Sequence, residues 1–241
     1  MNDFVRAARD ASLEISSLLE RGIDERLLEE LGRGHGGDIS RGLDMAAEKI
    51  LVDRLGSYGA IDSEESGIVT KGRESIVIDP VDGSANALSA FPYYGLSVAR
   101  MDRDKRVYDA VVCNLANGDF FYMCDEGPVC HENLFRGVVN TVQGSLESSI
   151  GLFEKAYANH EIVAALDREG LKFRSPGAVA LSLAYAHRVR YFLYVGEYRI
   201  YDFAAGLALC GEMRTIMGEG YVIVSSDAAL AEKIEALVAG D

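Results

Sequence analysis

The stretch that most constrains this chain is a hexapeptide that joins an apolar strand to a turn rich in carboxylates. Residues 75–78 (Ser-Ile-Val-Ile) predict a buried strand, which stops at Asp79-Pro80-Val81-Asp82-Gly83-Ser84. The proline fixes φ and removes a hydrogen-bond donor, so the turn can aim both aspartates and the Val81 carbonyl at one point. Oxygen ligands of this kind suit Mg²⁺. Taken alone, an exposed Asp-Pro-x-Asp-Gly turn explains the pattern equally well.

The end of the hexapeptide is suited to an anion. Gly83 permits close approach of the backbone, and the following residues, Ala85-Asn86-Ala87-Leu88, can open a helix. Free N–H groups at the start of a helix bind anions. The same turn can therefore hold both a metal and a phosphate that bridges to it.

Three further stretches carry carboxylates. Glu64-Glu65-Ser66-Gly67 follows a short apolar stretch, and residues 38–44 contain Asp38 and Asp44. Tyr201-Asp202-Phe203-Ala204-Ala205-Gly206 places one carboxylate at the head of an apolar helix. Each stretch has a purely structural alternative, which is an exposed loop for Glu64 and a helix cap for the aspartates.

The apolar periodicity predicts an α/β (α+β) fold, with an antiparallel first half and a more alternating second half. Helices are expected over residues 2–31, 43–55, 152–169 and 177–187, from Asp202 to Glu212, and from about Asp227 to the end. Strands are expected over residues 94–101, 107–113, 119–123, 137–143, 190–195 and 221–225. Gly32 to Gly37 contains four glycines, which predict a flexible loop.

Charge and composition exclude several classes of partner. The chain has a formal net charge of −14, so nucleic acid and anionic membranes are not expected to bind it. It has no apolar run near the ~20 residues that span a bilayer and no signal-peptide pattern. None of the four cysteines forms a Cys-x-x-Cys pair, which fits reduced thiols in a soluble, cytoplasmic protein.

In this order, the acidic stretches resemble the inositol monophosphatase superfamily, which also contains fructose-1,6-bisphosphatases and 3′-phosphoadenosine-5′-phosphate phosphatases. The similarity runs from about Asp38 to Gly211. It implies a layered αβαβα sandwich of the sugar phosphatase type. Dimers are usual among such enzymes, so the resemblance also implies a homodimer. A compositional boundary near residues 130–136 divides the chain into an N-terminal α+β part (1–132) with the metal-binding motifs and a C-terminal α/β part (133–241) expected to complete the metal site and substrate pocket.

The resemblance also implies the ligands of two to three Mg²⁺ ions. Glu64, Asp79 and the Val81 carbonyl would hold the first ion. Asp79, Asp82 and Asp202 would hold the second, with Asp79 bridging the two. A third, weaker ion would lie near Glu64, mostly on waters.

Further roles follow from the same resemblance. Asp44 and Ser84 would orient and help to deprotonate the attacking water, with Glu64 as the third catalytic residue. The backbone at Gly83 and Ser84 would hold the phosphate. The loop 32–37 would be mobile and close over the site, with Arg33 and His35 on it.

The implied activity is Mg²⁺-dependent hydrolysis of a small sugar or cyclitol phosphate by metal-activated water, with inositol-1-phosphate and/or fructose-1,6-bisphosphate as substrates. Related enzymes contact the rest of the substrate at positions that correspond to Lys172, Arg174, Ser175 and Gly177. Glu197 and Arg199 precede Asp202 and could reach the same pocket. Lys172 and Arg174 could hold a second phosphate, although an exposed charged loop explains them equally well.

Two other functions stay open at this point. A 3′-phosphoadenosine-5′-phosphate nucleotidase would need an adenine slot, which the sequence does not reveal. A non-catalytic sugar-phosphate-binding regulator on the same scaffold would not need the pair Asp44 and Ser84. The chain also departs from the family pattern, with Ser63 for Gly, Tyr201 for Trp, and Glu212-Met213-Arg214-Thr215 for Glu-Ala-Gly-Gly.

Overall fold

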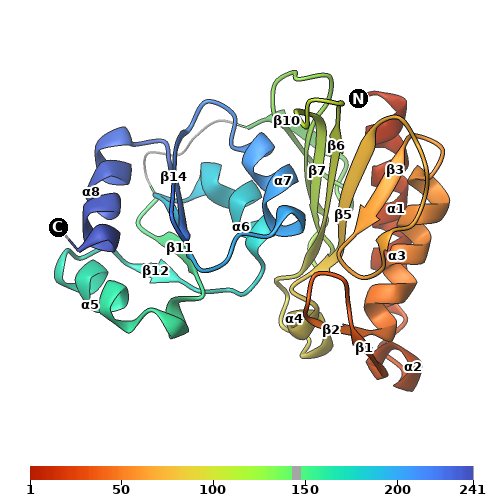
Figure 1. Cartoon of the computed structure of the whole chain (residues 1–241), viewed down its shortest axis with the longest axis horizontal. Helices are drawn as coiled ribbons and strands as arrows, with labels where there is room; N and C mark the ends of the chain where they lie inside the picture. Colours follow the sequence, from red (N-terminus) through yellow and green to blue (C-terminus); the bar gives the residue numbers. More distant parts are fainter. Residues whose placement is uncertain (143–147, 241) are drawn as a thin grey trace.

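The chain folds into five alternating layers of helices and sheets (Figure 1). The computed structural model describes residues 1–142 and 148–240. Helices α1 (Asp3–Glu20) and α3 (Gly42–Leu55) form the first layer, and α6 (Val179–Ala184) and α7 (Ile200–Leu209) lie between the two sheets. The layered αβαβα sandwich expected from the resemblance is confirmed.

The larger sheet has eight strands in the order β10-β9-β8-β7-β6-β5-β3-β4. Neighbouring strands are antiparallel except for β3 and β5, which are parallel. The bounds are β3 (Ala60–Ser63), β4 (Gly67–Ile68), β5 (Ser75–Asp82), β6 (Gly95–Met101), β7 (Val107–Asn114), β8 (Asp119–Met123), β9 (Cys130–Asn133) and β10 (Val138–Thr141).

The helices of the first layer bury one apolar face on this sheet. Asn2 caps α1 by accepting a hydrogen bond from the Val5 N–H, which satisfies one of the free donors at the helix start. Phe4, Val5 and Ile15 are fully buried against α3 and the sheet. Together with the second layer, this helical layer fixes the position of β5, which carries the hexapeptide.

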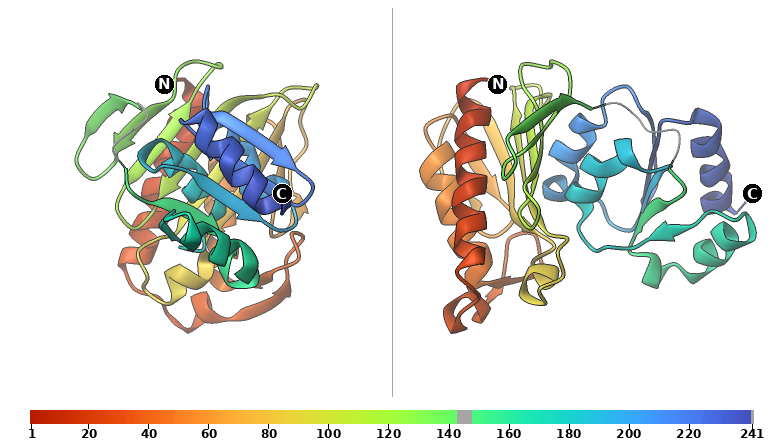
Figure 2. Two further views of the ribbon diagram at one scale, coloured as in Figure 1. Left: turned by 90° about the vertical axis from the view of Figure 1, so that its left-hand side faces the viewer. Right: turned by 180° about the vertical axis from the view of Figure 1, so that it is seen from behind.

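The smaller sheet has five strands in the order β12-β11-β13-β15-β14. The bounds are β11 (Gly151–Glu154), β12 (Phe173–Arg174), β13 (Phe192–Val195), β14 (Arg214–Gly218) and β15 (Tyr221–Ser225). Figure 2 shows α5 (His160–Arg168) and α8 (Ala228–Ala239) beside each other on its outer face. Among the described residues, none of the helices has the length and apolar character needed to cross a membrane.

Two predicted segments differ in the structure. The helix expected over 152–169 is the strand β11 followed, after a short turn, by α5. Leu152 and Phe153 are apolar because β11 is buried in the sheet beside β13, and a short apolar run does not distinguish a buried strand from a helix. The helical region expected over 2–31 ends earlier, because α2 (Glu25–Leu28) stops before the strand β1 (Glu30–Arg33).

The glycine-rich stretch is partly ordered by pairing. Gly32 and Arg33 belong to β1, which pairs with β2 (Ile39–Arg41). The rest of the predicted loop connects these two strands at the tip of the hairpin. The strand expected over 137–143 is β10, and residue 143 lies outside the described residues. The first sheet takes its last strand from residues 138–141, and the division of the chain at residue 132 stays a prediction.

Candidate metal and phosphate site

The hexapeptide occupies the end of β5, where the strand is irregular. In a regular strand, residues three apart point to opposite faces. Here the register with β6 shifts between Asp79 and Asp82, and both side chains line the same cavity. The irregularity therefore achieves what the sequence motif predicted, which is two carboxylates facing one point.

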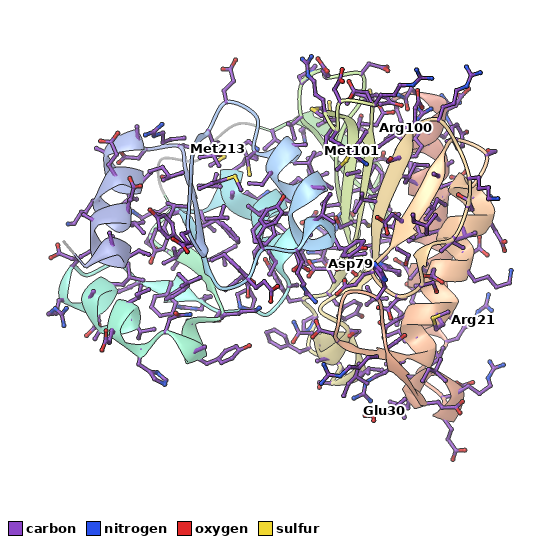
Figure 3. All side chains as sticks on the ribbon, viewed as in Figure 1. Arg21, Glu30, Asp79, Arg100, Met101 and Met213 are labelled. Atoms are coloured by element: carbon purple, nitrogen blue, oxygen red, sulfur yellow. The ribbon has the colours of Figure 1, made fainter. Side chains whose placement is uncertain are left out.

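Three segments bring carboxylates together at this point. Glu64 directly follows β3, and its N–H donates to the Ile78 carbonyl of the neighbouring β5 at 3.1 Å. Asp202 lies in the first turn of α7. One carboxylate oxygen each from Glu64, Asp79 and Asp202 lies within 4.8 Å of the others, and all three residues are buried. Figure 3 shows Asp79 on the side of the large sheet that faces the middle helices.

The cluster is electrostatically unfavourable without cations. Burial, followed by the neighbouring carboxylates of Glu64, Asp82 and Asp202, raises the pKa of Asp79 well above its usual range. Burial raises the pKa of Glu64 to about 7. A divalent ion would compensate this charge, and carboxylate oxygens are ligands that Mg²⁺ prefers. The donor set therefore fits the magnesium site that the family implies.

Asp82 lines the cavity and also holds the second half of the chain. Its two carboxylate oxygens accept the N–H groups of Val179 at 2.9 Å and Leu181 at 2.8 Å, in the first turn of α6. These bonds favour the ionised carboxylate, but burial and the charge of Asp202 still raise its pKa. Asp82 therefore has a structural role that the sequence motif did not reveal.

Gly83 and Ser84 form one wall of the cavity. Gly83 has a left-handed φ of 82°, and a Cβ at this position would lie 3.0 Å from the Ala178 Cβ. Only glycine fits both the conformation and the space. Ser84 begins α4 (Ser84–Leu88), so the helix that the sequence allowed after the motif is present.

Asp44 lies behind the cluster rather than on the cavity surface. It is in the first turn of α3, is 2% exposed, and accepts the Arg41 N–H at 2.9 Å. Burial and the nearby charge of Glu65 raise the pKa of Asp44 to about 7. It adds to the charge that raises the pKa of Asp79, so it lies near the cluster, but its pairing with Ser84 stays a prediction.

Arg199 occupies the centre of the site. Its guanidinium contacts Glu64 at 2.9 Å, Asp202 at 2.8 and 3.1 Å, and Asp38 at 2.6 Å. These carboxylates raise the pKa of Arg199 further, so it is fully charged. The sequence predicted that Arg199 contacts substrate. The structure places it in the site cavity and on the predicted metal ligands, and its contact with substrate stays a prediction.

The structure separates the other predicted substrate residues. Gly177 lines the site cavity, which has a volume of about 470 Å³. Lys172 and Arg174 instead line a separate cavity beside α5. Glu197 borders a third cavity, and its backbone carbonyl accepts the Tyr194 hydroxyl at 2.6 Å. The placement of Lys172, Arg174 and Glu197 at this site is therefore not supported by the structure, because β12 and the turn before α7 direct them elsewhere.

Sequence reasoning missed Glu154, Lys155 and Tyr157, which line the cavity at the end of β11 and just after it. Glu154 accepts the N–H of Gly177 at 2.9 Å, and Lys155 has a left-handed φ of 59°, unusual for a residue with a side chain. The Lys155 ammonium lies 5.2 Å from the centre of the Tyr194 ring. No motif marks these residues, and the sequence predicted a helix here rather than the end of a strand.

Comparisons with known proteins agree with this geometry. The model of the Inositol monophosphatase family matches residues 1–239. The chain is 30% identical over 230 residues to Nus factor SuhB of Escherichia coli K12, covering 91% of this chain and 84% of the relative. It is 30% identical over 162 residues to fructose-1,6-bisphosphatase/inositol-1-monophosphatase of Thermococcus kodakarensis, covering 66% of this chain and 60% of the relative. The crystallised IMPase of Thermotoga maritima shares the fold, with a TM-score of 0.78 at 20% identity over 97% of each chain.

Proposed function

This chain belongs to the inositol monophosphatase family, and we propose that it is a Mg²⁺-dependent phosphomonoesterase acting on a small sugar or cyclitol phosphate. The observation that carries the proposal is the buried carboxylate cluster of Glu64, Asp79 and Asp202. It lies in the same cavity as the backbone of Gly83 and Ser84. A cation site and an anion site side by side are what phosphate transfer to water requires.

We assign the ions to the cluster together with Asp82 and the Val81 carbonyl, as the resemblance implies. Both residues line the cavity. Bound Mg²⁺ would neutralise the phosphate dianion and make water a stronger nucleophile near neutral pH. The number of ions, two or three, belongs to the proposal.

The remaining tasks fall to side chains and backbone of the chain itself. The N–H groups at Gly83 and Ser84 would orient the phosphate oxygens. Asp44 would act as the general base, and Ser84 would relay the proton to it from the attacking water.

The size and charge of the cavity favour a small phosphorylated sugar or cyclitol. A volume of about 470 Å³ is within the usual range for small-molecule sites. Inositol-1-phosphate and fructose-1,6-bisphosphate are the proposed substrates. A second phosphate would be held by Lys155 rather than by Lys172 and Arg174, because Lys155 lines the cavity.

A phosphate-release assay tests the proposal. The panel contains inositol-1-phosphate, fructose-1,6-bisphosphate and 3′-phosphoadenosine-5′-phosphate, each with Mg²⁺ and with EDTA, and Asp79→Asn serves as the inactive control. We expect Mg²⁺-dependent turnover of a sugar or cyclitol phosphate with the highest kcat/KM. The highest kcat/KM on the adenosine substrate would establish the nucleotidase alternative, and no turnover of any ester would refute the enzyme proposal.

A non-catalytic regulator is the second candidate, because curated relatives over most of the chain bear the name Nus factor SuhB. The presence of both Asp44 and Ser84 favours the enzyme, since binding alone needs neither. A rise in melting temperature on adding inositol-1-phosphate, without phosphate release, would favour the regulator. We also propose a cytoplasmic homodimer, and light scattering during size-exclusion chromatography tests the assembly.

A further inference from the structure

Arg199 is the residue immediately before α7, and its guanidinium reaches into the carboxylate cluster. Nη1 lies 2.9 Å from Glu64 Oε1, while Nε and Nη2 lie 2.8 and 3.1 Å from the two oxygens of Asp202. The pairing with Asp202 is therefore bidentate, which is the strongest geometry for an arginine and a carboxylate. Arg199 thus contacts two of the three carboxylates that form the candidate metal cluster.

A guanidinium and a divalent ion cannot both occupy these carboxylates without strong repulsion. Two positive charges a few ångströms apart in a partly buried site repel by several kcal/mol, in the range of 4 kcal/mol at 4 Å for an effective dielectric constant of ~20. The arginine is charged at every accessible pH, so it cannot avoid this repulsion by losing a proton. Loading of the site must therefore move the guanidinium away from at least one carboxylate.

We propose that Arg199 is a built-in competitor for one of the divalent cations, which holds the metal-free site together and is displaced when that cation binds. The proposal rests on the proposed metal-dependent function. In the metal-free protein, Arg199 would give the crowded, buried carboxylates an internal counter-ion. It also makes the affinity of the site for cations lower than the carboxylates alone would give.

The same guanidinium connects the site to the glycine-rich tip between β1 and β2. Nη1 also lies 2.6 Å from Asp38 Oδ2 and 3.5 Å from the Gly36 carbonyl. The tip is held from the other side as well, because the Gly36 N–H donates to the Glu64 carbonyl at 2.6 Å. Displacement of Arg199 would remove its contacts with this tip while the backbone bond to Glu64 remains. Metal loading and the position of the tip are therefore coupled.

Titration calorimetry with Mn²⁺ and Mg²⁺ on the metal-free protein tests the proposal without any substrate. We compare the unmodified protein with Arg199→Gln, Arg199→Lys and Arg41→Gln. Arg41 is the matched control, because it lines the same cavity but pairs with Glu30 at 2.9 Å and not with the cluster. Arg199→Lys keeps the charge and loses the bidentate fork.

We expect Arg199→Gln to bind one cation at least tenfold more tightly, which corresponds to about 1.4 kcal/mol. Arg41→Gln should change the affinity by much less, and Arg199→Lys should lie between. The melting temperature of Arg199→Gln in EDTA should fall, because the carboxylates lose their internal counter-ion. A structure with Mn²⁺ should show the guanidinium away from Glu64 or Asp202.

Three results would overturn the inference. The first is equal or weaker cation binding by Arg199→Gln, and the second is an equal gain in Arg41→Gln, which would indicate a general charge effect. In both cases the unmodified protein still binds metal, so the proposed function would survive. The third is no cation binding by any of the four proteins, which would refute the metal centre together with the role of Arg199.

Discussion

Asp79 and Asp82 are three residues apart in one motif, yet replacing each by Asn should change the stability of the metal-free protein in opposite directions. Asp79 accepts a single backbone hydrogen bond, from the Val81 N–H at 3.0 Å, and faces other carboxylates. Asp82 accepts two N–H groups of α6 with its two oxygens. The sequence motif gives both residues the same role as ligands, so the difference comes only from the fold.

The magnitude follows from the hydrogen bonds. An amide has one acceptor oxygen, so Asp82→Asn leaves the N–H of Val179 or Leu181 facing another donor. An unsatisfied buried donor costs ~1–3 kcal/mol. In a chain of this size each kcal/mol shifts the melting temperature by ~2–4 °C, so Asp82→Asn should melt ~4–8 °C below Asp79→Asn for a difference of ~2 kcal/mol. Asp79→Asn should melt above the unmodified protein, because it removes a repelling charge.

Differential scanning calorimetry at pH 7 in EDTA measures this order directly. Repeating the scans with Mg²⁺ adds a second readout, because a ligand that binds only the folded state raises stability. The unmodified protein should gain stability on adding Mg²⁺, and both variants should lose most of that gain. If Asp82→Asn were as stable as Asp79→Asn in EDTA, the capping role of Asp82 would be wrong.

Two other predictions use the same protein. In EDTA, the free energy of unfolding should fall as pH rises from about 5 to 7, because the folded-state pKa values of Asp44 and Glu64 are near 7 and both groups are protonated in the folded state below that pH. Each group contributes up to ~1.4 kcal/mol per pH unit. Denaturant unfolding measures this free energy, and a value that does not change with pH would contradict the argument that burial raises these pKa values. Lys155→Met should raise KM for fructose-1,6-bisphosphate severalfold more than for inositol-1-phosphate, because only the bisphosphate has a second phosphate for Lys155 to bind. Equal changes in the steady-state KM of the two substrates would exclude this role of Lys155.

The metal-binding half of the site could be predicted from the sequence because its residues lie in short motifs with strong local causes. The apolar strand before Asp79 fixes where the hexapeptide begins, and Gly83 marks a backbone position that other residues cannot adopt. The strand expected to stop before Asp79 runs on to Asp82, through the first part of the motif. Three strands of the antiparallel first half, β6, β7 and β8, were predicted within one residue. Their alternation and turns are local signals, which the long-range packing then confirms.

The substrate side could not be predicted in the same way, because its residues are set by the packing of the second sheet. Lys172 directly precedes the edge strand β12 and Arg174 belongs to it, whereas Lys155 directly follows β11, which lies between β12 and β13. Because β11 was read as part of a helix, the sequence did not predict that Glu154 and Lys155 lie at the end of a strand beside the cavity. The ion pairs of Arg199 with Glu64 and Asp38 join segments more than 130 positions apart, and no local pattern encodes such contacts.

The start of α6 is hydrogen-bonded to carboxylates from both sheets. Asp82 from the first sheet and Glu154 from the second both accept hydrogen bonds from this short segment, Glu154 from the N–H of Gly177 and Ala178 and from the Ser182 hydroxyl. Carboxylates beside the free N–H groups at a helix start are favourable, so each fixes the helix relative to its own sheet.

Glu154→Gln separates this structural role from metal binding. It should lower the melting temperature in EDTA by an amount similar to Asp82→Asn, because the amide again leaves buried donors without a full set of acceptors. Unlike Asp82→Asn, it should retain the gain in stability on adding Mg²⁺, since Glu154 is not in the Glu64, Asp79 and Asp202 cluster. The double variant should lose less than the two single losses combined if the helix start is released as one unit. Loss of the Mg²⁺ response in Glu154→Gln would instead make Glu154 part of the cation site, and the second sheet would then contribute a metal ligand as well as a support.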